Sequence, residues 1–526
     1  MPVIPVQTAF RLAVQHQTAG RLAEAEAIYR QILAVEPNHA AAYSNLGEAY
    51  RVTNRFAEAV DVFQRAIHLN PNLAEAHYNL GLALVGLERK DEALAEFRQA
   101  LKIKPNYAEA HNNLGNVLKE QDRPEEAEAA FRRTLEIKPD YAPAHNNLGN
   151  LLGDEGQFES AMAEYQRALE LDPTYVEACN NLGRTLVELR RFDEARVALA
   201  RALALRPNYP VAKFNAAFLA LLHGDYERGW HWYESRWEVP PVKMPPYSQP
   251  LWKGEPLDGK RILIHAEQGF GDSLHFIRYA ALVAARGGEV IVGCQPALER
   301  LFRTAAGVKA VITDGNNPGE FDVQIPMLSQ PLVFQTRLES IPRDIPYLFA
   351  DPAQVECWRK RLGERRSPLR VGLAWAGDLQ HRRNRKRSIA LQMLQPLWRL
   401  EGIEFFSLQI GPEAAQLAEL STAPIVDHTS LIADFADTAA FMAELDLVIT
   451  VDTAVAHLAG ALGRPVWTLL SFVPDWRWGL EGEDTPWYPT MRLFRQPALC
   501  DWESVIQRVE AELGRLRETA GAGRIG

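Results

Sequence analysis

A step of 34 residues repeats through the first part of the chain. The tripeptide Asn-Leu-Gly recurs with this step and ends at Gly47, Gly81, Gly115, Gly149 and Gly183. Prolines with the same step form a second series, at Pro37, Pro71, Pro105, Pro139, Pro173 and Pro207. Two series in one register predict a repeated pair of helices, with a small residue where the helices cross and a proline that ends the second helix. The first part of the chain is therefore expected to be a stack of similar helical units.

One whole unit is the segment AEAHYNLGLALVGLERKDEALAEFRQALKIKPNY. A 34-residue period with this pattern is typical of the tetratricopeptide repeat (TPR). Six repeats are expected between about residues 6 and 209, and the altered segment AKFNAAFLALLHGDYERGWHWYESRW is expected to be a capping unit. Every one of the 12 tryptophans lies at 230 or later, which marks a boundary near residue 237. We therefore assign 1–237 to an all-α TPR solenoid.

One asparagine position recurs in all of these units, at Asn45, Asn79, Asn113, Asn147, Asn181 and Asn215. Stacked repeats place equivalent positions in a row, so we expect a ladder of amides along the concave groove. Each amide offers two donors and an acceptor, which suits the main chain of an extended peptide. This half of the chain resembles the TPR array of O-GlcNAc transferase, in which such a ladder lines the groove. The alternative is that these asparagines only satisfy polar groups between repeats.

Composition excludes several classes of protein. The formal net charge is -10, which argues against a general nucleic-acid binder because such proteins need an excess of positive charge. The start of the chain has no signal-peptide pattern, and no apolar run is long enough to span a membrane, so a cytoplasmic protein is expected. The four cysteines are scattered without metal-binding spacing and are expected to be free thiols.

The second half predicts an α/β architecture. Residues 238–258 carry six prolines and are expected to form a stiff linker. Apolar strand segments separated by helical segments then follow, namely RILIHA, EVIVGCQ, AVIT, FDVQIP, LRVGLAWAG, IEFFSLQI, DLVITVD and VWTLLS. This alternation is typical of parallel sheets buried on both faces. We expect two Rossmann-like lobes, at 259–350 and 351–500, a cleft between them, and a C-terminal helix and tail at 501–526.

Several motifs of other enzyme classes are missing from the sequence. The Gly-x-Gly at 269–271 lacks the third glycine and the downstream acid of a dinucleotide site, so hydride transfer is not expected. From residue 250 on, no Asp-x-Asp pair is present that would hold a metal-bound diphosphate. If the chain binds a nucleotide diphosphate, we expect the protein to supply the positive charge, with no metal and no cofactor besides the nucleotide-sugar substrate.

Two segments resemble one family of enzymes. The pattern strand–Asp–Thr–x–x–x–His–helix in VITVDTAVAHLAGALGRPVW resembles the C-terminal lobe of heptosyltransferase-type GT-B glycosyltransferases. The segment EQGFGDSLHF resembles the loop of their N-terminal lobe, and the likeness covers roughly 261–495. The whole layout resembles bacterial TPR glycosyltransferases. The resemblance implies an inverting hexosyl- or heptosyltransferase. The heptosyltransferases carry no TPR array, so their acceptor does not carry over. The catalytic domain of O-GlcNAc transferase has a different pattern, so its donor does not carry over either.

The donor lobe offers a helix N-terminus to the diphosphate. Thr453 can cap this helix or bind a phosphate oxygen, and the small Ala454 leaves room for a ligand near the backbone. His457, one turn later, is a candidate to donate to the leaving phosphate; the alternative is a buried, hydrogen-bonded core histidine. Asp452 either contacts the ligand or braces the turn.

A basic segment, DLQHRRNRKRS, follows the first strand of the second lobe. Arg385 and Lys386 are our candidates to hold the diphosphate, with Arg387 as a third cation of the same group; the alternative is a solvated loop. Gln409, at the end of the next strand, is a candidate to contact the base or ribose.

Asp272 is our candidate general base, because it faces the cleft from the acceptor lobe. The alternative is that it caps a helix. Glu267 and His265 are the reserve candidates, and Trp476 and Trp478 are expected mainly to pack.

Three functions are compatible with these patterns. The first is a metal-independent glycosyltransferase that moves a sugar from a nucleotide-diphosphate donor to a protein or peptide in the TPR groove. The second is a TPR scaffold whose lobes are degenerate or only sense a nucleotide sugar, and the third is a glycan-directed transferase that its repeats recruit. A homodimer is compatible with each of them.

Overall fold

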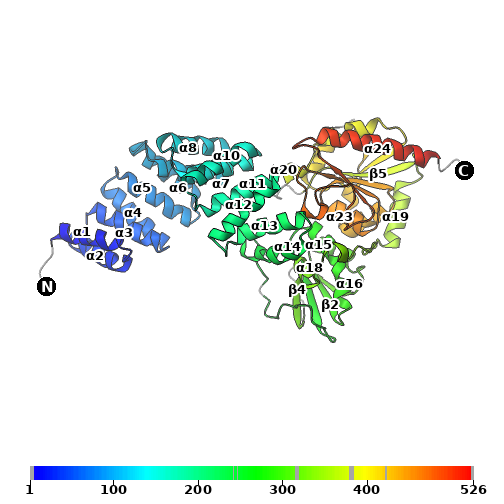
Figure 1. Cartoon of the computed structure of the whole chain (residues 1–526), viewed down its shortest axis with the longest axis horizontal. Coiled ribbons are helices and arrows are strands. Elements are labelled where there is room, and N and C mark those ends of the chain that lie inside the picture. Colours follow the sequence, from blue (N-terminus) through cyan, green and yellow to red (C-terminus); the bar gives the residue numbers. More distant parts are fainter. Residues whose placement is uncertain are drawn as a thin grey trace. The chain divides into compact units, whose positions relative to one another are not determined.

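The computed structural model describes residues 5–240, 242–245, 247–313, 319–377, 384–420 and 423–522. The chain divides into two compact units, 1–207 and 208–526. The first unit consists of helix pairs in chain order (Figure 1). These helices are α1 (Val6–Thr18), α2 (Leu22–Val35), α3 (Ala40–Val52), α4 (Phe56–Leu69), α5 (Ala74–Gly86), α6 (Lys90–Ile103), α7 (Ala108–Glu120), α8 (Pro124–Ile137), α9 (Ala142–Asp154), α10 (Phe158–Leu171), α11 (Val176–Glu188) and α12 (Phe192–Leu205). The first unit is a TPR solenoid, as the 34-residue step predicted.

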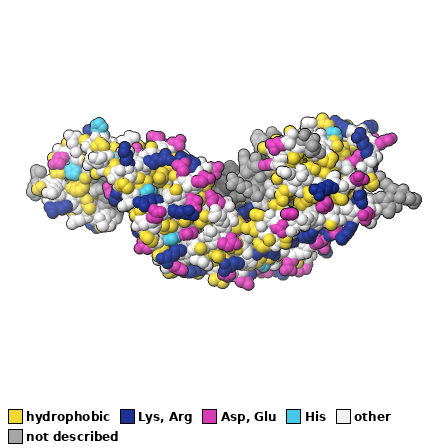
Figure 2. Space-filling view, turned by 90° about the horizontal axis from the view of Figure 1, so that it is seen from above, with side chains coloured by type: hydrophobic (Ala, Val, Ile, Leu, Met, Phe, Trp, Pro, Cys, Tyr) yellow, Lys and Arg dark blue, Asp and Glu magenta, His cyan; other side chains and the backbone are white. Residues whose placement is uncertain are grey.

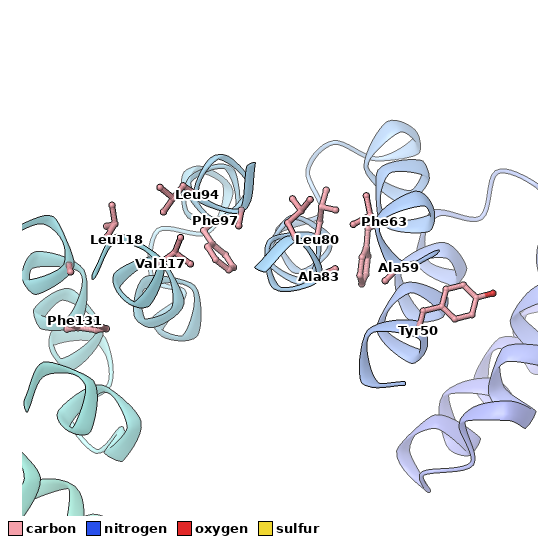
Figure 3. Packing of buried hydrophobic residues seen from close by; sticks show 14 of the residues in the cluster. Tyr50, Ala59, Phe63, Leu80, Ala83, Leu94, Phe97, Val117, Leu118 and Phe131 are labelled. Carbon is pink, nitrogen blue, oxygen red and sulfur yellow. The ribbon is translucent and has the colours of Figure 1, made fainter. Parts of the chain in front are cut away.

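The repeated glycine has a packing role in this solenoid. A Cβ atom on Gly115 would lie 2.6 Å from Cε1 of Phe131, so the ring of Phe131 occupies the space that any other side chain would need. The same close contact recurs between Gly81 and Phe97. These phenylalanines belong to a buried apolar cluster, and Figure 3 shows Phe97 beside Val117, with Phe131 on a helix farther along the array. The Asn-Leu-Gly tripeptide thus marks the crossing point of each helix pair.

The second unit begins with another helical hairpin, α13 (Pro210–Leu222) and α14 (Tyr226–Tyr233), and the 3₁₀ helix η1 (Glu234–Glu238). The sequence pattern assigned this hairpin to the array. In the structure, the boundary between the two compact units lies at 207–208, so the hairpin belongs to the same unit as the lobes. The aromatic residues of α14 account for the difference. Trp230 donates to the carbonyl of Thr336 at 3.0 Å, and its ring meets the edge of Trp476 at 5.0 Å. The hairpin therefore packs against both lobes.

The first lobe contains a parallel sheet of strand order β3-β2-β1-β4. Its strands are β1 (Arg261–His265), β2 (Glu289–Cys294), β3 (Val308–Thr313) and β4 (Val323–Pro326). Its helices are α15 (Phe270–Phe276), η2 (Ile277–Tyr279), α16 (Ala280–Ala284), η3 (Pro296–Leu298), α17 (Glu299–Phe302), η4 (Met327–Ser329), α18 (Gln330–Val333) and η5 (Leu338–Ser340). The end of the proline-rich segment packs against this lobe, because the backbone of Trp252 donates to the carbonyl of Gln324 at 2.8 Å.

The second lobe contains a parallel sheet of strand order β10-β9-β8-β5-β6-β7. Its strands are β5 (Leu369–Ala374), β6 (Ile403–Ser407), β7 (Ile425–Val426), β8 (Leu447–Val451), β9 (Val466–Leu470) and β10 (Met491–Arg495). Its helices are α19 (Pro352–Leu362), α20 (Asn384–Arg387), η6 (Leu391–Arg399), η7 (Pro412–Ala415), α21 (Gln416–Glu419), η8 (Thr429–Leu431), α22 (Phe435–Ala443), α23 (Ala454–Ala461), η9 (Trp476–Trp478) and α24 (Trp502–Ala522). Apolar residues of α24, such as Val505 and Val509, share a core with β5 and β8.

All eight predicted strand segments form strands in this arrangement, as β1 to β6, β8 and β9, and the sequence pattern missed β7 and β10. Parallel sheets in two successive lobes confirm the predicted α/β part, which is consistent with a GT-B-like fold. The lobes meet directly, since α15 of the first packs against α23 of the second. This contact brings the two motif segments of the sequence together.

The visible face of the molecule in Figure 2 carries basic and acidic side chains in an interspersed pattern. Neither sign of charge forms a broad continuous patch on that face. Among the helices of the described residues, none combines the length and the apolar character that crossing a bilayer requires.

Candidate functional site

The segment after β8 forms a helix N-terminus, as predicted. β8 is buried along its whole length, and the chain then turns at Asp452 into α23. Thr453 is the N-cap residue, and its hydroxyl oxygen accepts a hydrogen bond from the backbone N–H of Val455 at 3.3 Å. Ala454, the first helical residue, is only partly buried. The first turn of α23 can therefore present backbone N–H groups and the positive end of the helix dipole to an anion.

His457 lies inside the junction between the lobes. Its ring stacks on Trp478 at a centroid distance of 5.2 Å, and its Nδ1 lies 3.0 Å from the hydroxyl of Tyr488. Burial, together with the charges of Arg477 and Arg278, lowers the pKa of His457 well below its ordinary value. This environment matches the alternative interpretation, a buried and hydrogen-bonded histidine. The neutral ring can still donate one hydrogen bond, so a contact with phosphate stays a prediction.

Gly271 allows this close approach of the lobes. A Cβ atom on Gly271 would lie 3.0 Å from Cδ2 and 3.6 Å from Nε2 of His457. The Nε2 edge of the ring therefore faces the first turn of α15, which carries Asp272. Trp476 and Trp478 are both buried, in agreement with the expectation that they mainly pack.

Asp272 forms an ion pair across the lobe junction. Its partner is Arg477 of η9, which also contacts Asp475 at 2.8 Å. The side chain of Asp272 is 23% exposed, and burial raises its pKa while Arg477 acts in the opposite direction. The alternative interpretation of Asp272 as a helix cap is wrong, because Gly269 is the N-cap and Asp272 lies in the first turn of α15. The role of Asp272 as general base stays a prediction.

Asp452 has a carboxyl that is easily protonated. Burial raises its pKa to about 6, and the nearby carboxylate of Asp475 adds to the shift, while Arg387 opposes it. An ionised Asp452 would repel a diphosphate, whereas the protonated carboxyl could donate a hydrogen bond to it. Its predicted contact with the donor is thus compatible with the protonated form.

The basic segment offers three candidate cations, Arg385, Lys386 and Arg387, and the structure describes the side chains of the last two. The side chain of Arg385 lies outside the described part of the chain. Lys386 lies in α20, next to residues 378–383, which are also not described. Arg387 is the cation whose position is informative, because its charge acts on the titration of Asp272, Asp452 and His457. The sequence pattern favours Arg385 and Lys386 over Arg387.

Gln409 braces the backbone after β5. Its Oε1 accepts from the backbone N–H groups of Trp375 at 3.0 Å and Ala376 at 2.9 Å. Its Nε2 donates to the carbonyl of Ile410 at 3.1 Å. The amide therefore holds the loop that leads to the basic segment, and a contact with the base or ribose stays a prediction.

The two reserve candidates for the base are buried. Glu267 forms a bidentate ion pair with Arg236, at 2.9 and 3.0 Å, and accepts from the backbone N–H of Leu328 at 2.9 Å. His265 is buried at the end of β1, and burial lowers its pKa to about 4. Glu267 thus joins η1 to the first lobe, and this structural role leaves Asp272 as the better candidate.

The asparagine ladder of the solenoid is bonded between repeats. Asn147 donates to the Oδ1 of Asn112 at 3.1 Å, and Asn181 donates to the Oδ1 of Asn146 at 3.0 Å. Asn113 donates to the hydroxyl of Tyr78 at 2.8 Å. In each pair the acceptor lies 35 positions earlier, so one N–H of each amide links neighbouring repeats, as the alternative interpretation expected. Asn45 and Asn79 occupy the same position on α3 and α5, and Asn215 lies on α13 in the second unit.

A pocket with a volume of about 360 Å³ opens beside the middle of this ladder. Its walls come mainly from α5, α7 and α9. Four amides line it, from Asn113, Asn116, Asn147 and Asn150, and the apolar lining residues are Leu82, Val85, Phe97 and Val117. An ion pair between Lys119 and Asp154, at 2.8 Å, links the two helices at its rim. The pocket combines an apolar floor with amide donors and acceptors.

Family models match both halves of the chain. The tetratricopeptide repeat matches residues 10–74, 54–108, 78–142 and 112–176 with one model and 154–213 with another. Glycosyltransferase family 9 (heptosyltransferase) matches residues 414–501. The chain carries tetratricopeptide repeats and a segment that matches glycosyltransferase family 9. The second match contains Asp452, Thr453 and His457, together with Arg477 and Tyr488, whereas Asp272 lies before it.

Protein FlbA of Caulobacter vibrioides is 28% identical in an alignment 326 residues long, and this alignment covers 57% of this chain and 54% of FlbA. The chain therefore spans about half the length of this curated relative. Among solved structures, the array is similar to YrrB, described as a TPR protein with an unusual peptide-binding site, at 24% identity and a TM-score of 0.30, over 35% of this chain and 95% of YrrB. PilF of Pseudomonas aeruginosa is 21% identical with a TM-score of 0.35, over 38% of this chain and 92% of PilF.

Sequence reasoning missed the residues that join the lobes, above all Arg477, Tyr488 and His275. A local signal existed only for Arg477, which stands between two tryptophans in an aromatic loop. In the described residues, no group of three or more His, Cys, Asp or Glu side chains is placed to hold a metal ion. Metal independence stays a prediction.

Proposed function

We propose that the chain transfers a sugar from a nucleotide-diphosphate donor to a protein or peptide that the TPR groove holds. The family 9 match, which covers the strand–Asp–Thr–x–x–x–His segment, carries this proposal. The donor diphosphate binds at the first turn of α23, near Thr453 and Ala454. Arg387 supplies positive charge in place of a metal, because its charge lowers the pKa of Asp272, Asp452 and His457.

The acceptor hydroxyl is deprotonated by Asp272. Burial raises the pKa of this carboxyl, which makes it a stronger base near neutral pH. Arg477 keeps the side chain at the lobe junction through its ion pair. Since α15 packs against α23, the base approaches the helix terminus that holds the departing diphosphate. The resemblance to heptosyltransferase-type enzymes implies that the displacement is inverting.

The acceptor is an extended polypeptide with an apolar side chain. The pocket beside the ladder carries four asparagine amides, which suit peptide N–H and C=O groups, and an apolar floor of Leu82, Val85 and Val117. The rim charges of Lys119 and Asp154 are paired with each other, so the pocket favours an uncharged side chain.

One observation favours a second function, a scaffold without catalytic activity. The carboxylate of Asp272 is already ion-paired with Arg477, and the ring of His457 packs between Gly271 and Trp478. A protein that only binds a nucleotide sugar, or that uses its lobes for assembly, would show the same contacts.

A binding experiment with two variants tests the proposed function. Calorimetry would measure the binding of UDP, GDP, ADP and dTDP, and of an extended peptide library, to the wild type, Arg387→Gln and Asn116→Ala. Arg387→Gln is expected to weaken one nucleotide about tenfold or more and to leave peptide binding unchanged. Asn116→Ala is expected to do the reverse, so each variant is the control for the other. Absence of nucleotide binding to the wild type would refute the transferase, and loss of both ligands in one variant would refute two separate sites.

A further inference from the structure

One phenol hydroxyl, that of Tyr488, lies between two histidines from different lobes. The Nδ1 atoms of His275 in α15 and of His457 in α23 each lie 3.0 Å from this hydroxyl. The ring of Tyr488 fits against α23 because Gly460 has no side chain; a Cβ there would lie 2.4 Å from Cδ1 of the ring. Tyr488, His275 and His457 are all buried. A hydrogen-bonded path thus connects the acceptor lobe to the donor lobe.

Both imidazoles of this path are neutral. Burial, followed by the positive charges of Arg278 and Arg477, lowers the pKa of His275 well below its ordinary value, and His457 is affected in the same direction. A neutral imidazole carries one proton, either on Nδ1 or on Nε2. The tautomer of each ring therefore depends on which nitrogen has a partner.

The position of the proton on His275 follows from its unpaired nitrogen. Among the described residues, Nε2 of His275 is buried and has no hydrogen-bond partner. A proton on this atom would leave a buried donor unsatisfied, which is costly, whereas a proton on Nδ1 is donated to the hydroxyl oxygen of Tyr488. His275 is therefore the Nδ1–H tautomer.

The hydroxyl proton of Tyr488 then has two acceptors in reach. One is Nδ1 of His457 at 3.0 Å, and the other is the hydroxyl of Tyr347 at 3.3 Å. The Tyr347 oxygen already accepts from Nη2 of Arg278 at 3.0 Å, and its own proton goes to the carbonyl of Leu274 at 2.9 Å. The imidazole nitrogen is closer, and no other donor among the described residues is hydrogen-bonded to it, so Tyr488 donates to His457.

We propose that Tyr488 is a positioning residue that holds His457 as the Nε2–H tautomer, through a relay from His275 to Tyr488 to His457. The Nε2 edge of His457 faces Gly271 in the first turn of α15, since a Cβ on Gly271 would lie 3.6 Å from this nitrogen. The use of this N–H rests on the proposed function: it donates a hydrogen bond to an oxygen of the departing diphosphate. His275 belongs to the acceptor lobe, so the tautomer is set only while the two lobes are in contact.

The relay is tested by a spectrum that requires no substrate. Long-range ¹H–¹⁵N correlation of histidine-labelled full-length protein distinguishes Nδ1–H from Nε2–H rings, and the variants His275→Gln and His457→Gln assign the signals. The wild type is expected to have His275 as Nδ1–H and His457 as Nε2–H. In Tyr488→Phe, the signal of His457 is expected to shift to a mixture of both tautomers. A wild-type His457 in the Nδ1–H form, or a tautomer that Tyr488→Phe leaves unchanged, would overturn the proposal.

Binding of the nucleoside diphosphate tests whether the relay positions His457 to donate a hydrogen bond to that ligand. Tyr488→Phe is expected to weaken this binding about tenfold, as loss of a well-placed hydrogen bond to a charged group does. Tyr279→Phe is the matched control, because Tyr279 is another fully buried tyrosine, and its hydroxyl lies 2.8 Å from the Oγ1 of Thr336. Equal affinities of the two variants would overturn the positioning role. If the wild type binds no nucleotide, the proposed function fails, while the spectra still decide the relay.

Discussion

Replacing Gly115 by alanine is expected to destabilise the TPR array. The new Cβ would lie 2.6 Å from Cε1 and 2.8 Å from Cδ1 of Phe131, whose ring is fully buried. Overpacking of this kind costs about 1–3 kcal/mol. The better helix propensity of alanine offsets up to about 1 kcal/mol of this cost.

Gly153→Ala is the matched control, because a Cβ there would lie 3.7 Å from the nearest atom, the Cβ of Ala161, which is an ordinary contact. Both variants gain helix propensity, so the difference between their free energies of unfolding isolates the overpacking cost, about 1–3 kcal/mol. Denaturant unfolding followed by far-UV circular dichroism measures it. Since all 12 tryptophans lie at 230 or later, tryptophan fluorescence reports on the second unit and is expected to be unchanged. If Gly115→Ala is as stable as Gly153→Ala, the packing argument for the repeated glycine is refuted.

Two further predictions concern pH. Burial and Asp475 raise the pKa of Asp452 to about 6. Above that pH the carboxylate is ionised in both states, and its charge destabilises the folded protein relative to the unfolded chain. Asp452→Asn is therefore expected to raise the Tm above pH 6 and to lose this effect in more acidic buffer; a Tm difference independent of pH would contradict it. Burial lowers the pKa of His77, but the Glu96 carboxylate, 2.6 Å from Nδ1, outweighs it, and the pKa is raised. The His77–Glu96 pair therefore stabilises the folded protein fully below the unfolded pKa of about 6.5, and this stabilisation is lost as the pH rises through the folded pKa. In thermal melts, His77→Gln is expected to lower the Tm most in acid. His111→Gln, at a site where burial lowers the pKa, should show the opposite trend.

Local patterns were enough to predict the solenoid and most of the sheets. The glycine of Gly115 recurs at Gly47, Gly81, Gly149 and Gly183, each time opposite a bulky Phe, Tyr or Leu, and most buried strands are apolar runs. β7 was missed because it has only two residues, and β10 because arginines interrupt its apolar residues. Whether segments such as β7 and β10 form strands depends on the neighbouring strands of the sheet and not on their own sequence alone.

The lobe junction could not be predicted in the same way. Asp272 and Arg477 are 205 residues apart, and His275 and Tyr488 are 213 residues apart. Such contacts depend on how two separately folded sheets meet, and no periodic pattern in one segment encodes that meeting. The motif residues Thr453 and His457 were recognisable, but the burial of His457 and the importance of Arg387 required the structure.

The asparagine ladder illustrates a third limit. The 34-residue step correctly placed the amides in a row along the A helices. It did not tell whether an amide faces a ligand or the next repeat, because both orientations have the same period. Asn147 and Asn181 use one N–H toward the preceding repeat.

The most direct test of the account is the turnover of nucleotide sugars by the purified full-length protein. Release of the nucleoside diphosphate from UDP-, GDP-, ADP- and dTDP-sugars would be measured for the wild type and for Asp272→Asn, with circular dichroism as the control for folding. We expect one donor to be turned over by the wild type, and the folded variant to be slower by a factor of about 100 or more, as expected for loss of a general base. No release from any donor, or equal release by the two proteins, would contradict the central claim that this lobe pair is a glycosyltransferase with Asp272 as its base.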